Sequence, residues 1–211
     1  MARLGCGLLA TLFLALFPAL AGSPYPGGAE VHAGSDIRKD VPRPYRLLGI
    51  DRSTVGSLRL IRIRALMLKG PEQTWMVLDD VERWPEFFHL FSEIRPVETS
   101  GELRRYRFSV RPPWPMADFD SVVLVRSSPQ ERQILWNIEE GALAGMFGRI
   151  LVLEASLEQG SEVVYESFGS AGKRFPAWVV KIGLHIVLPG VLRQLSERLQ
   201  AQFPKPAEKK P

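Results

Sequence analysis

The segment VLDDVERWPEFFHLFSEI, residues 77–94, brings two adjacent acids, a Trp-Pro pair, three phenylalanines and a histidine close together. Catalysis by such side chains needs an acid and a base that converge in one pocket. The chain holds no G-x-S-x-G, H-E-x-x-H or phosphate-loop motif, and its histidines are too scattered to suggest a zinc site. The sequence therefore predicts no catalytic residue, no metal site and no cofactor. The polar residues that could face a pocket are His89, His185, Asp118, Asp120, Glu139 and Tyr165.

Two of these polar residues have simpler interpretations. His185 lies in an apolar segment, where a lone histidine is usually a hydrogen-bonded interior residue and seldom a general base. Asp120 is expected to make a structural hydrogen bond at the start of its strand.

The first 21 residues predict export. Arg3 supplies a positive start, residues 4–20 form an uncharged apolar run, and residues 19–21 match the small-x-small pattern that signal peptidase accepts. We predict a cleaved signal peptide over 1–21 and a periplasmic or secreted protein. The alternative is a retained membrane anchor, because the run is near the length that spans a bilayer. Cleavage would also remove Cys6, the only cysteine, and with it any disulfide or cysteine nucleophile.

The composition is that of a globular protein with one domain. The 211 residues are 45% hydrophobic and 24% charged, which fits a single core of ordinary size. The formal net charge of +4 could suggest a nucleic acid partner, but the basic residues fall on one strand face and in a Pro-rich tail. We therefore expect no nucleic acid. These residues are Arg104, Arg105, Arg107 and Arg111 on the strand, and Lys205, Lys209 and Lys210 in the tail.

The chain divides into an arm, a folded domain and a tail. Residues 22–56 are rich in Gly, Pro and Ser without a sustained period, which is typical of a linker or loosely docked arm. The domain is predicted over 57–203, followed by a disordered basic tail over 204–211. Residues 58–67 alternate as a half-buried strand, and 94–171 are predicted to form a meander of about six antiparallel strands.

A helical corner is predicted between the first strand and the meander. Residues 71–78 should form a short helix that begins with Pro71. Asp79 and Glu82 have the spacing of a capping box for a second helical turn. Trp84 should leave the helical region, because it precedes a proline.

The phenylalanines after the proline are predicted to gather on one side. A helical turn that starts at Pro85 would make Phe87 and Phe91 i,i+4 neighbours, with Phe88 on the same side.

The last long element is predicted to be one helix over 176–202, kinked at Pro189-Gly190. Its half from 178 to 192 is apolar nearly all round, so it must be covered on more than one side. One side of this helix carries Trp178, Ile182, His185, Ile186 and Pro189.

The order of these elements and three segments resemble the START-like superfamily, also called SRPBCC. It includes polyketide cyclases, coenzyme Q-binding proteins and START lipid-transfer domains. WMVLDDVERWPEFF resembles its helix corner, RPPWPMADFDSVVLV a strand of the lipid-transfer domains, and FPAWVVKIGLHIVLPGVLRQL their terminal helix. The resemblance covers residues 58–203 and implies an α+β helix-grip fold, a curved antiparallel sheet wrapped around a long C-terminal helix. Phe119 departs from it, because many START domains carry an arginine there, before the aspartate that matches Asp120.

The resemblance implies a deep apolar cavity between the sheet and the terminal helix, with the Trp-Pro corner near its mouth. Such cavities bind a sterol, phospholipid, quinone or polyketide. The corner phenylalanines can line this cavity or simply pack in the core, and the sequence leaves both readings open. The predicted lining or mouth residues are Trp84, Phe87, Phe88, Phe91, Phe108, Trp114, Trp136, Trp178, Ile182, His185, Ile186 and Pro189.

Two functions from different classes fit these features. A carrier of a hydrophobic small molecule or lipid needs only a cavity and a gate, whereas a cyclase, aromatase or hydrolase needs an acid-base pair that faces the cavity. The predicted export favours the carrier. A third, weaker interpretation is transient contact with a membrane through the apolar half of the terminal helix.

Overall fold

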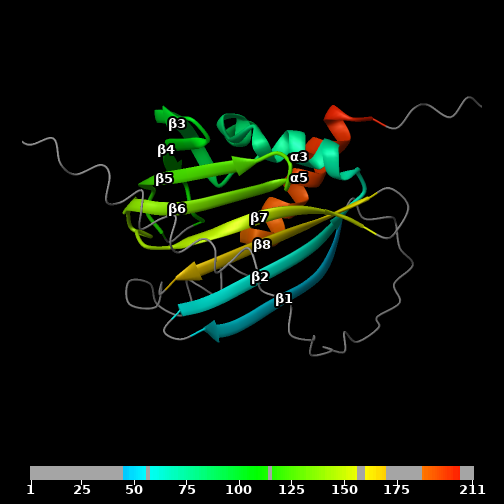
Figure 1. Cartoon of the computed structure of the whole chain (residues 1–211), viewed down its shortest axis with the longest axis horizontal. Helices are drawn as coiled ribbons and strands as arrows, with labels where there is room; N and C mark the ends of the chain where they lie inside the picture. The colour runs from blue at the N-terminus through cyan, green and yellow to red at the C-terminus, as the bar shows by residue number, and fades with distance from the viewer. Residues whose placement is uncertain (1–44, 56–57, 114–115, 156–159, 170–186, 205–211) are drawn as a thin grey trace, which may run out of the picture. The chain divides into compact units, whose positions relative to one another are not determined.

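An eight-stranded antiparallel sheet dominates the computed structural model (Figure 1). The structure describes residues 45–55, 58–113, 116–155, 160–169 and 187–204. In chain order the elements are β1 (Tyr45–Val55), β2 (Leu58–Met67), α3 (Pro71–Asp79), η1 (Val81–Glu86), β3 (Phe91–Ser100), β4 (Leu103–Val110), β5 (Phe119–Ser128), β6 (Gln133–Gly141), β7 (Phe147–Glu154), β8 (Ser161–Gly169) and α5 (Leu188–Gln202). The predicted signal peptide and basic tail lie outside these ranges, apart from residue 204.

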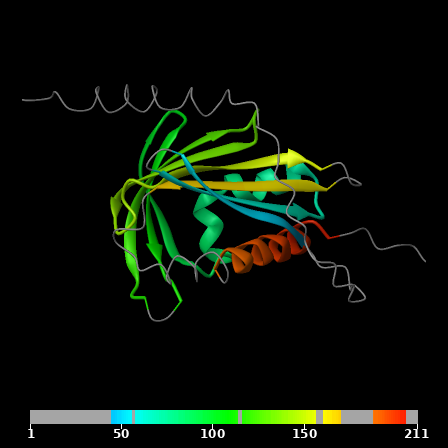
Figure 2. The same cartoon turned by 90° about the horizontal axis from the view of Figure 1, so that it is seen from below.

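The meander is confirmed. The strand order is β1-β2-β8-β7-β6-β5-β4-β3, so β3 to β8 follow one another in space as they do in sequence, and β2 joins the far side of β8. Figure 2 shows the sheet curving around α3, η1 and α5. The molecule thus has the predicted α+β helix-grip architecture, and the face toward the helices is called the concave face below.

The first strand corrects the prediction of an arm over 22–56 for residues 45–55, whereas residues 22–44 lie outside the described part. β1 pairs with β2 from Tyr45 opposite Met67 to Val55 opposite Leu58. A bulge at Leu48 interrupts this pairing. Tyr45 and Ile50 both pack against the core, although they are five positions apart and would lie on opposite faces of a regular strand. The bulge restores their common face and hides the period of two in the sequence.

Alternation along β2 and β4 follows the prediction. Ile63 and Met67 are buried while Arg64 between them is exposed, and on β4 Tyr106 and Phe108 are buried. The concave face of the sheet therefore carries the core, and the convex face carries arginines such as Arg64 and Arg107. Arg104 of β4 is different, because it lies with Tyr106 on the concave side.

The corner begins as predicted and then differs. α3 starts at Pro71, but η1 is a 3₁₀ helix over Val81–Glu86 that includes both Trp84 and Pro85. Trp84 does not leave the helical region, because its buried indole donates a hydrogen bond to the backbone oxygen of Leu78 at 3.1 Å. This tertiary anchor outweighs the local preference of a residue before proline. Phe91 is the first residue of β3, so the predicted helical turn to Phe91 is wrong.

The predicted capping box is also wrong. Asp80 precedes η1 and makes no side-chain capping bond. The Asp79 carboxylate instead accepts a hydrogen bond from the Ser127 hydroxyl of β5 and pairs with Arg104 of β4. The acid at this position therefore ties the end of α3 to the sheet.

The terminal helix is described from Leu188 onward. Leu192, Leu195 and Leu199 are buried on one side of α5, which contacts α3 and β1. Pro189 lies in the first turn, where backbone N–H groups have no acceptor within the helix, so the missing N–H of proline costs no hydrogen bond. Residues 176–186 lie outside the described part, so the kink at Pro189-Gly190 stays a prediction. No helix within the described ranges has both the length and the apolarity needed to span a bilayer.

Candidate functional site on the concave face

The aromatic corner consists of Trp84, Phe87, Phe88, Phe91 and Phe108. Its rings meet mostly edge to face, with centroids 5.6 Å apart for Trp84 and Phe88 and 5.3 Å apart for Phe91 and Phe108. Trp84 is 9% exposed and Phe88 only 3%. These contacts are those of a packed core. That the corner also borders a ligand cavity stays a prediction.

The corner is fastened to α5 by polar contacts. The Arg198 guanidinium lies 5.5 Å from the centroid of the Phe87 ring and donates a hydrogen bond to Glu86 at 3.0 Å. The backbone N–H of His89 donates to the Gln194 side chain at 3.3 Å. His89 therefore helps to position the terminal helix through its main chain, while its side chain is exposed.

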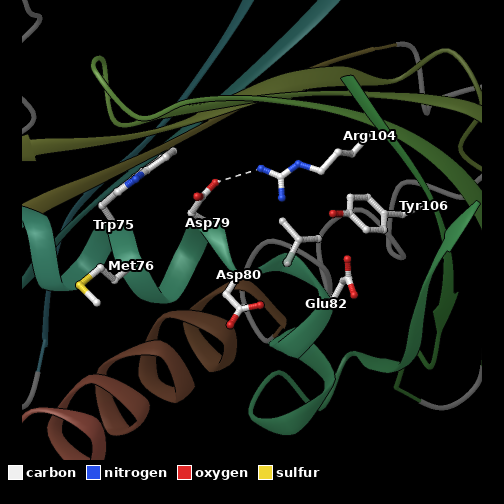
Figure 3. A pocket seen from close by; sticks show the side chains of 8 residues that line it. Trp75, Met76, Asp79, Asp80, Glu82, Arg104 and Tyr106 are labelled. Carbon is white, nitrogen blue, oxygen red and sulfur yellow. Dashed lines mark ion pairs between the residues drawn. The ribbon is translucent and has the colours of Figure 1, made fainter. Parts of the chain in front are cut away.

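A pocket of about 370 Å³ opens beside the corner, between the end of α3, η1 and β4. Figure 3 shows its lining, with Asp79 and Arg104 directed toward each other on one side. Burial raises the pKa of Tyr106, and the neighbouring Arg104 partly offsets this increase. The lining residues are Trp75, Met76, Asp79, Asp80, Val81, Glu82, Arg104 and Tyr106.

This corner pocket contains none of the residues predicted to line a cavity. The sequence pointed to the corner, but the aromatic side chains that it singled out lie in the core, and α3 and β4 supply the pocket wall instead. The alternation of β4 identifies Tyr106 as an inward residue, yet no sequence pattern brings Trp75 to the same place.

A second aromatic pair lies on the concave face of the central strands. The rings of Trp136 on β6 and Tyr165 on β8 are nearly parallel, 15° apart, with centroids separated by 6.0 Å. Both side chains are only partly buried, and Ile138 and Ile150 lie beside them against the same core. We call Trp136, Tyr165 and the glycine between them, Gly148, the concave floor.

Gly148 makes this pairing possible. It lies on β7, directly opposite Trp136 on one side and Ser167 of β8 on the other. A Cβ atom at position 148 would lie 2.6 Å from Cζ2 of Trp136 and 2.0 Å from the backbone oxygen of Glu166. Both distances are too short for any side chain, so only glycine lets the indole reach across β7 to Tyr165.

The polar groups of the floor differ from those of the corner. Within the described ranges the Trp136 indole N–H has no hydrogen-bond partner, and the Tyr165 hydroxyl has only the Ser167 side chain. By contrast the Trp84 indole N–H of the corner donates to the backbone oxygen of Leu78 at 3.1 Å. Burial raises the pKa of Tyr165 to about 12, against a smaller opposing effect of Ser167. Tyr165 is therefore a neutral hydrogen-bond donor at physiological pH.

The acids considered for catalysis do not converge. Asp120 accepts a hydrogen bond from Ser109 at 2.8 Å, as expected of a structural residue at the start of β5. Glu139 accepts one from Arg105 at 2.7 Å, and Asp118 lies 3.6 Å from Arg111. No group of metal-ligating side chains occurs among the residues that the structure describes.

The remaining predicted lining residues can be placed only in part. Pro189 contributes its backbone oxygen to the bond with Tyr45. Trp136 and Phe108 lie on the concave face, as the strand pattern predicted. Trp114, Trp178, Ile182, His185 and Ile186 lie outside the described residues.

No protein-family model matches the chain, and no curated protein matches it. Solved structures nevertheless share its fold. A START superfamily protein from Mycobacterium smegmatis is 14% identical, with a TM-score of 0.58 over 68% of this chain and 98% of its own. The Zhui aromatase/cyclase from Streptomyces sp. R1128 is 15% identical, with a TM-score of 0.56 over 69% of this chain and 95% of its own.

A STAR-related lipid transfer protein from Xanthomonas axonopodis is also similar. It is 13% identical, with a TM-score of 0.52, and the match covers 72% of this chain and 99% of that one. The chain therefore has the START-like fold that the three sequence segments suggested.

Proposed function

We propose that the protein binds a hydrophobic ligand on the concave side of its sheet and carries it between membranes or proteins. The observation that carries this proposal is the half-buried apolar surface of β6, β7 and β8 inside a START-like fold. An ordinary core would bury these side chains, whereas here Trp136 and Tyr165 stay partly open. Pockets for small molecules combine such apolar surface with a few polar groups.

The proposed ligand class is a lipid, sterol, quinone or polyketide-like molecule. The similarity to a STAR-related lipid transfer protein supports it, because that fold is used there for a hydrophobic cargo. We propose in addition that residues 1–21 direct export to the periplasm or the outside of the cell, where such cargo must cross water. Loading would then involve transient contact with a membrane surface.

A second candidate is an aromatase, cyclase or hydrolase that acts on a substrate in the same place. The similarity to the Zhui aromatase/cyclase favours it. The chemistry of the described residues speaks for the carrier, because the acids considered above form ion pairs or hydrogen bonds with neighbouring strands. Tyr165, with its raised pKa, is a poor general base at neutral pH.

Native mass spectrometry of residues 22–211 tests the proposal. The protein purified from its natural host should carry a noncovalent adduct that organic solvent extracts and mass spectrometry identifies. A carrier releases this molecule unchanged when it is incubated with vesicles, whereas an enzyme converts it. A protein that stays free of adducts and binds none of the four ligand classes in vitro would contradict both candidates.

A further inference from the structure

The concave floor carries hydrogen-bond donors on an apolar surface, and this combination points to a particular kind of ligand. Two other aromatic residues of the described structure have polar ends that the protein itself satisfies. The Trp84 indole donates to Leu78 and the Tyr45 hydroxyl to Pro189. The Trp136 indole N–H has no such partner among the described residues, and the Tyr165 hydroxyl has only the Ser167 side chain, so both groups can donate to a ligand that supplies acceptors.

The geometry of the floor favours a flat ligand. Trp136 and Tyr165 are nearly parallel, so a further ring can extend the same stack. A flexible acyl chain would gain less from this arrangement, because it has no rigid face to lay on the rings. Gly148 strengthens the argument, since any larger residue there would push the indole out of the stack.

We propose that Trp136 and Tyr165 recognise a planar ring system with oxygen acceptors, such as a quinone or an oxygenated polycyclic molecule. The ring stacks on the two aromatic side chains, and a carbonyl or hydroxyl oxygen accepts a hydrogen bond from the Tyr165 hydroxyl or the Trp136 indole N–H. This inference rests on the proposed function and narrows its ligand class. It makes these two side chains the specificity-determining residues of the concave face.

Equilibrium dialysis with three probes tests the inference. The probes are 1,4-naphthoquinone, which has rings and acceptors; naphthalene, which has rings alone; and cis-parinaric acid, a linear acyl chain. The wild-type protein should bind naphthoquinone about fivefold more tightly than naphthalene, which is what one hydrogen bond contributes. Trp136→Leu removes a stacking partner, so it should lower the affinity for naphthoquinone and for naphthalene about tenfold.

Two conservative variants separate stacking from hydrogen bonding. Tyr165→Phe and Trp136→Phe keep a ring but remove the hydroxyl or the indole N–H. At least one of them should lose the preference for naphthoquinone over naphthalene while naphthalene binding is unchanged. Because these changes leave a ring in place, the two variants still test the inference if Trp136→Leu fails to fold.

The opposite face of the same strands offers a matched control. Phe147 on β7 and Phe168 on β8 form another stacked pair, with centroids 5.4 Å apart and planes 9° apart. By alternation they lie on the convex face, since Ile150 and Tyr165 of the same strands face the core. Phe147→Leu should therefore leave the affinity for all three probes unchanged.

The outcomes distinguish this inference from the proposed function. Binding of cis-parinaric acid without ring binding would overturn the inference and leave the carrier proposal standing. The inference would also be overturned if Trp136→Leu bound the two ring probes as tightly as the wild type. The same holds if Phe147→Leu weakened the binding of these probes as strongly as Trp136→Leu does. If none of the probes binds the wild-type protein, the proposed function fails and the inference fails with it.

Discussion

Two aromatic regions share the concave face of this sheet, and they are built differently. In the aromatic corner Trp84 is 9% exposed, meets its neighbours edge to face and donates its N–H to Leu78. In the concave floor Trp136 is partly buried, lies nearly parallel to Tyr165, and has no hydrogen-bond partner among the residues described. The difference teaches that a conspicuous aromatic motif can serve packing, while the proposed binding surface is marked by parallel rings and by an indole N–H that has no partner in the described structure.

The largest effect should come from truncating the corner. Phe88→Ala removes a ring that is 3% exposed, so it should lower the free energy of unfolding by about 3 to 5 kcal/mol. Chemical denaturation monitored by circular dichroism measures this loss. A loss of less than about 1 kcal/mol would show that Phe88 borders open space, and the contrast between corner and floor would disappear.

The strands beneath the floor are fixed from the convex side by a buried carboxylate. Glu166 on β8 is 1% exposed and accepts hydrogen bonds from Arg62 at 2.6 Å and Arg149 at 2.5 Å. Burial by itself would raise the pKa of Glu166, but the two guanidinium groups outweigh this effect and hold the pKa below its ordinary value of 4.5. Glu166→Gln should cost about 2 kcal/mol of stability at neutral pH, because charge-assisted bonds are lost.

The same group predicts how stability depends on pH. Because the folded protein lowers the pKa of Glu166, its stabilising contribution is complete above about pH 4.5 and is lost as the pH falls through the folded value. Denaturation curves of wild type and Glu166→Gln should therefore converge as the solution is acidified below pH 4.5. Curves that stay parallel from pH 7 to pH 3 would refute the role assigned to this carboxylate.

The smallest effect compares the two tryptophans directly. Trp84→Phe removes an N–H that is hydrogen-bonded and leaves the Leu78 backbone oxygen without its donor. It should therefore lower the free energy of unfolding by about 1 to 2 kcal/mol. Trp136→Phe removes an N–H that has no partner in the described structure and should change stability by less than about 0.5 kcal/mol. Thermal melts of the pair measure the difference. Equal losses would mean that both indoles are core residues.

Much of the fold could be predicted from the sequence, because its cues were local. The alternation of residues 58–67 and the turn residues of the meander led to the correct strands, and three segments led to the START-like fold. β1 could not be predicted, because the bulge at Leu48 breaks its period. The form of the corner was missed because burial of Trp84 overrides the preference before Pro85.

The candidate site was less accessible to sequence reasoning. Trp136 stood out by its strand pattern, but its partnership with Tyr165 depends on the register of three strands. The role of Gly148 depends on the same register, because a glycine in a strand does not indicate which side chain of a neighbouring strand lies over it. The corner pocket was missed because it joins Trp75 of α3 to Tyr106 of β4, two residues distant in sequence.

A crystal structure of the protein with bound 1,4-naphthoquinone, or with the ligand that co-purifies, tests the central claim most directly. The account predicts ring density parallel to Trp136 and Tyr165, about 3.5 to 4 Å from their atoms, with a ligand oxygen about 3 Å from the Tyr165 hydroxyl or the Trp136 indole nitrogen. Ligand density confined to the corner pocket between α3, η1 and β4, with the concave floor unchanged, would contradict it.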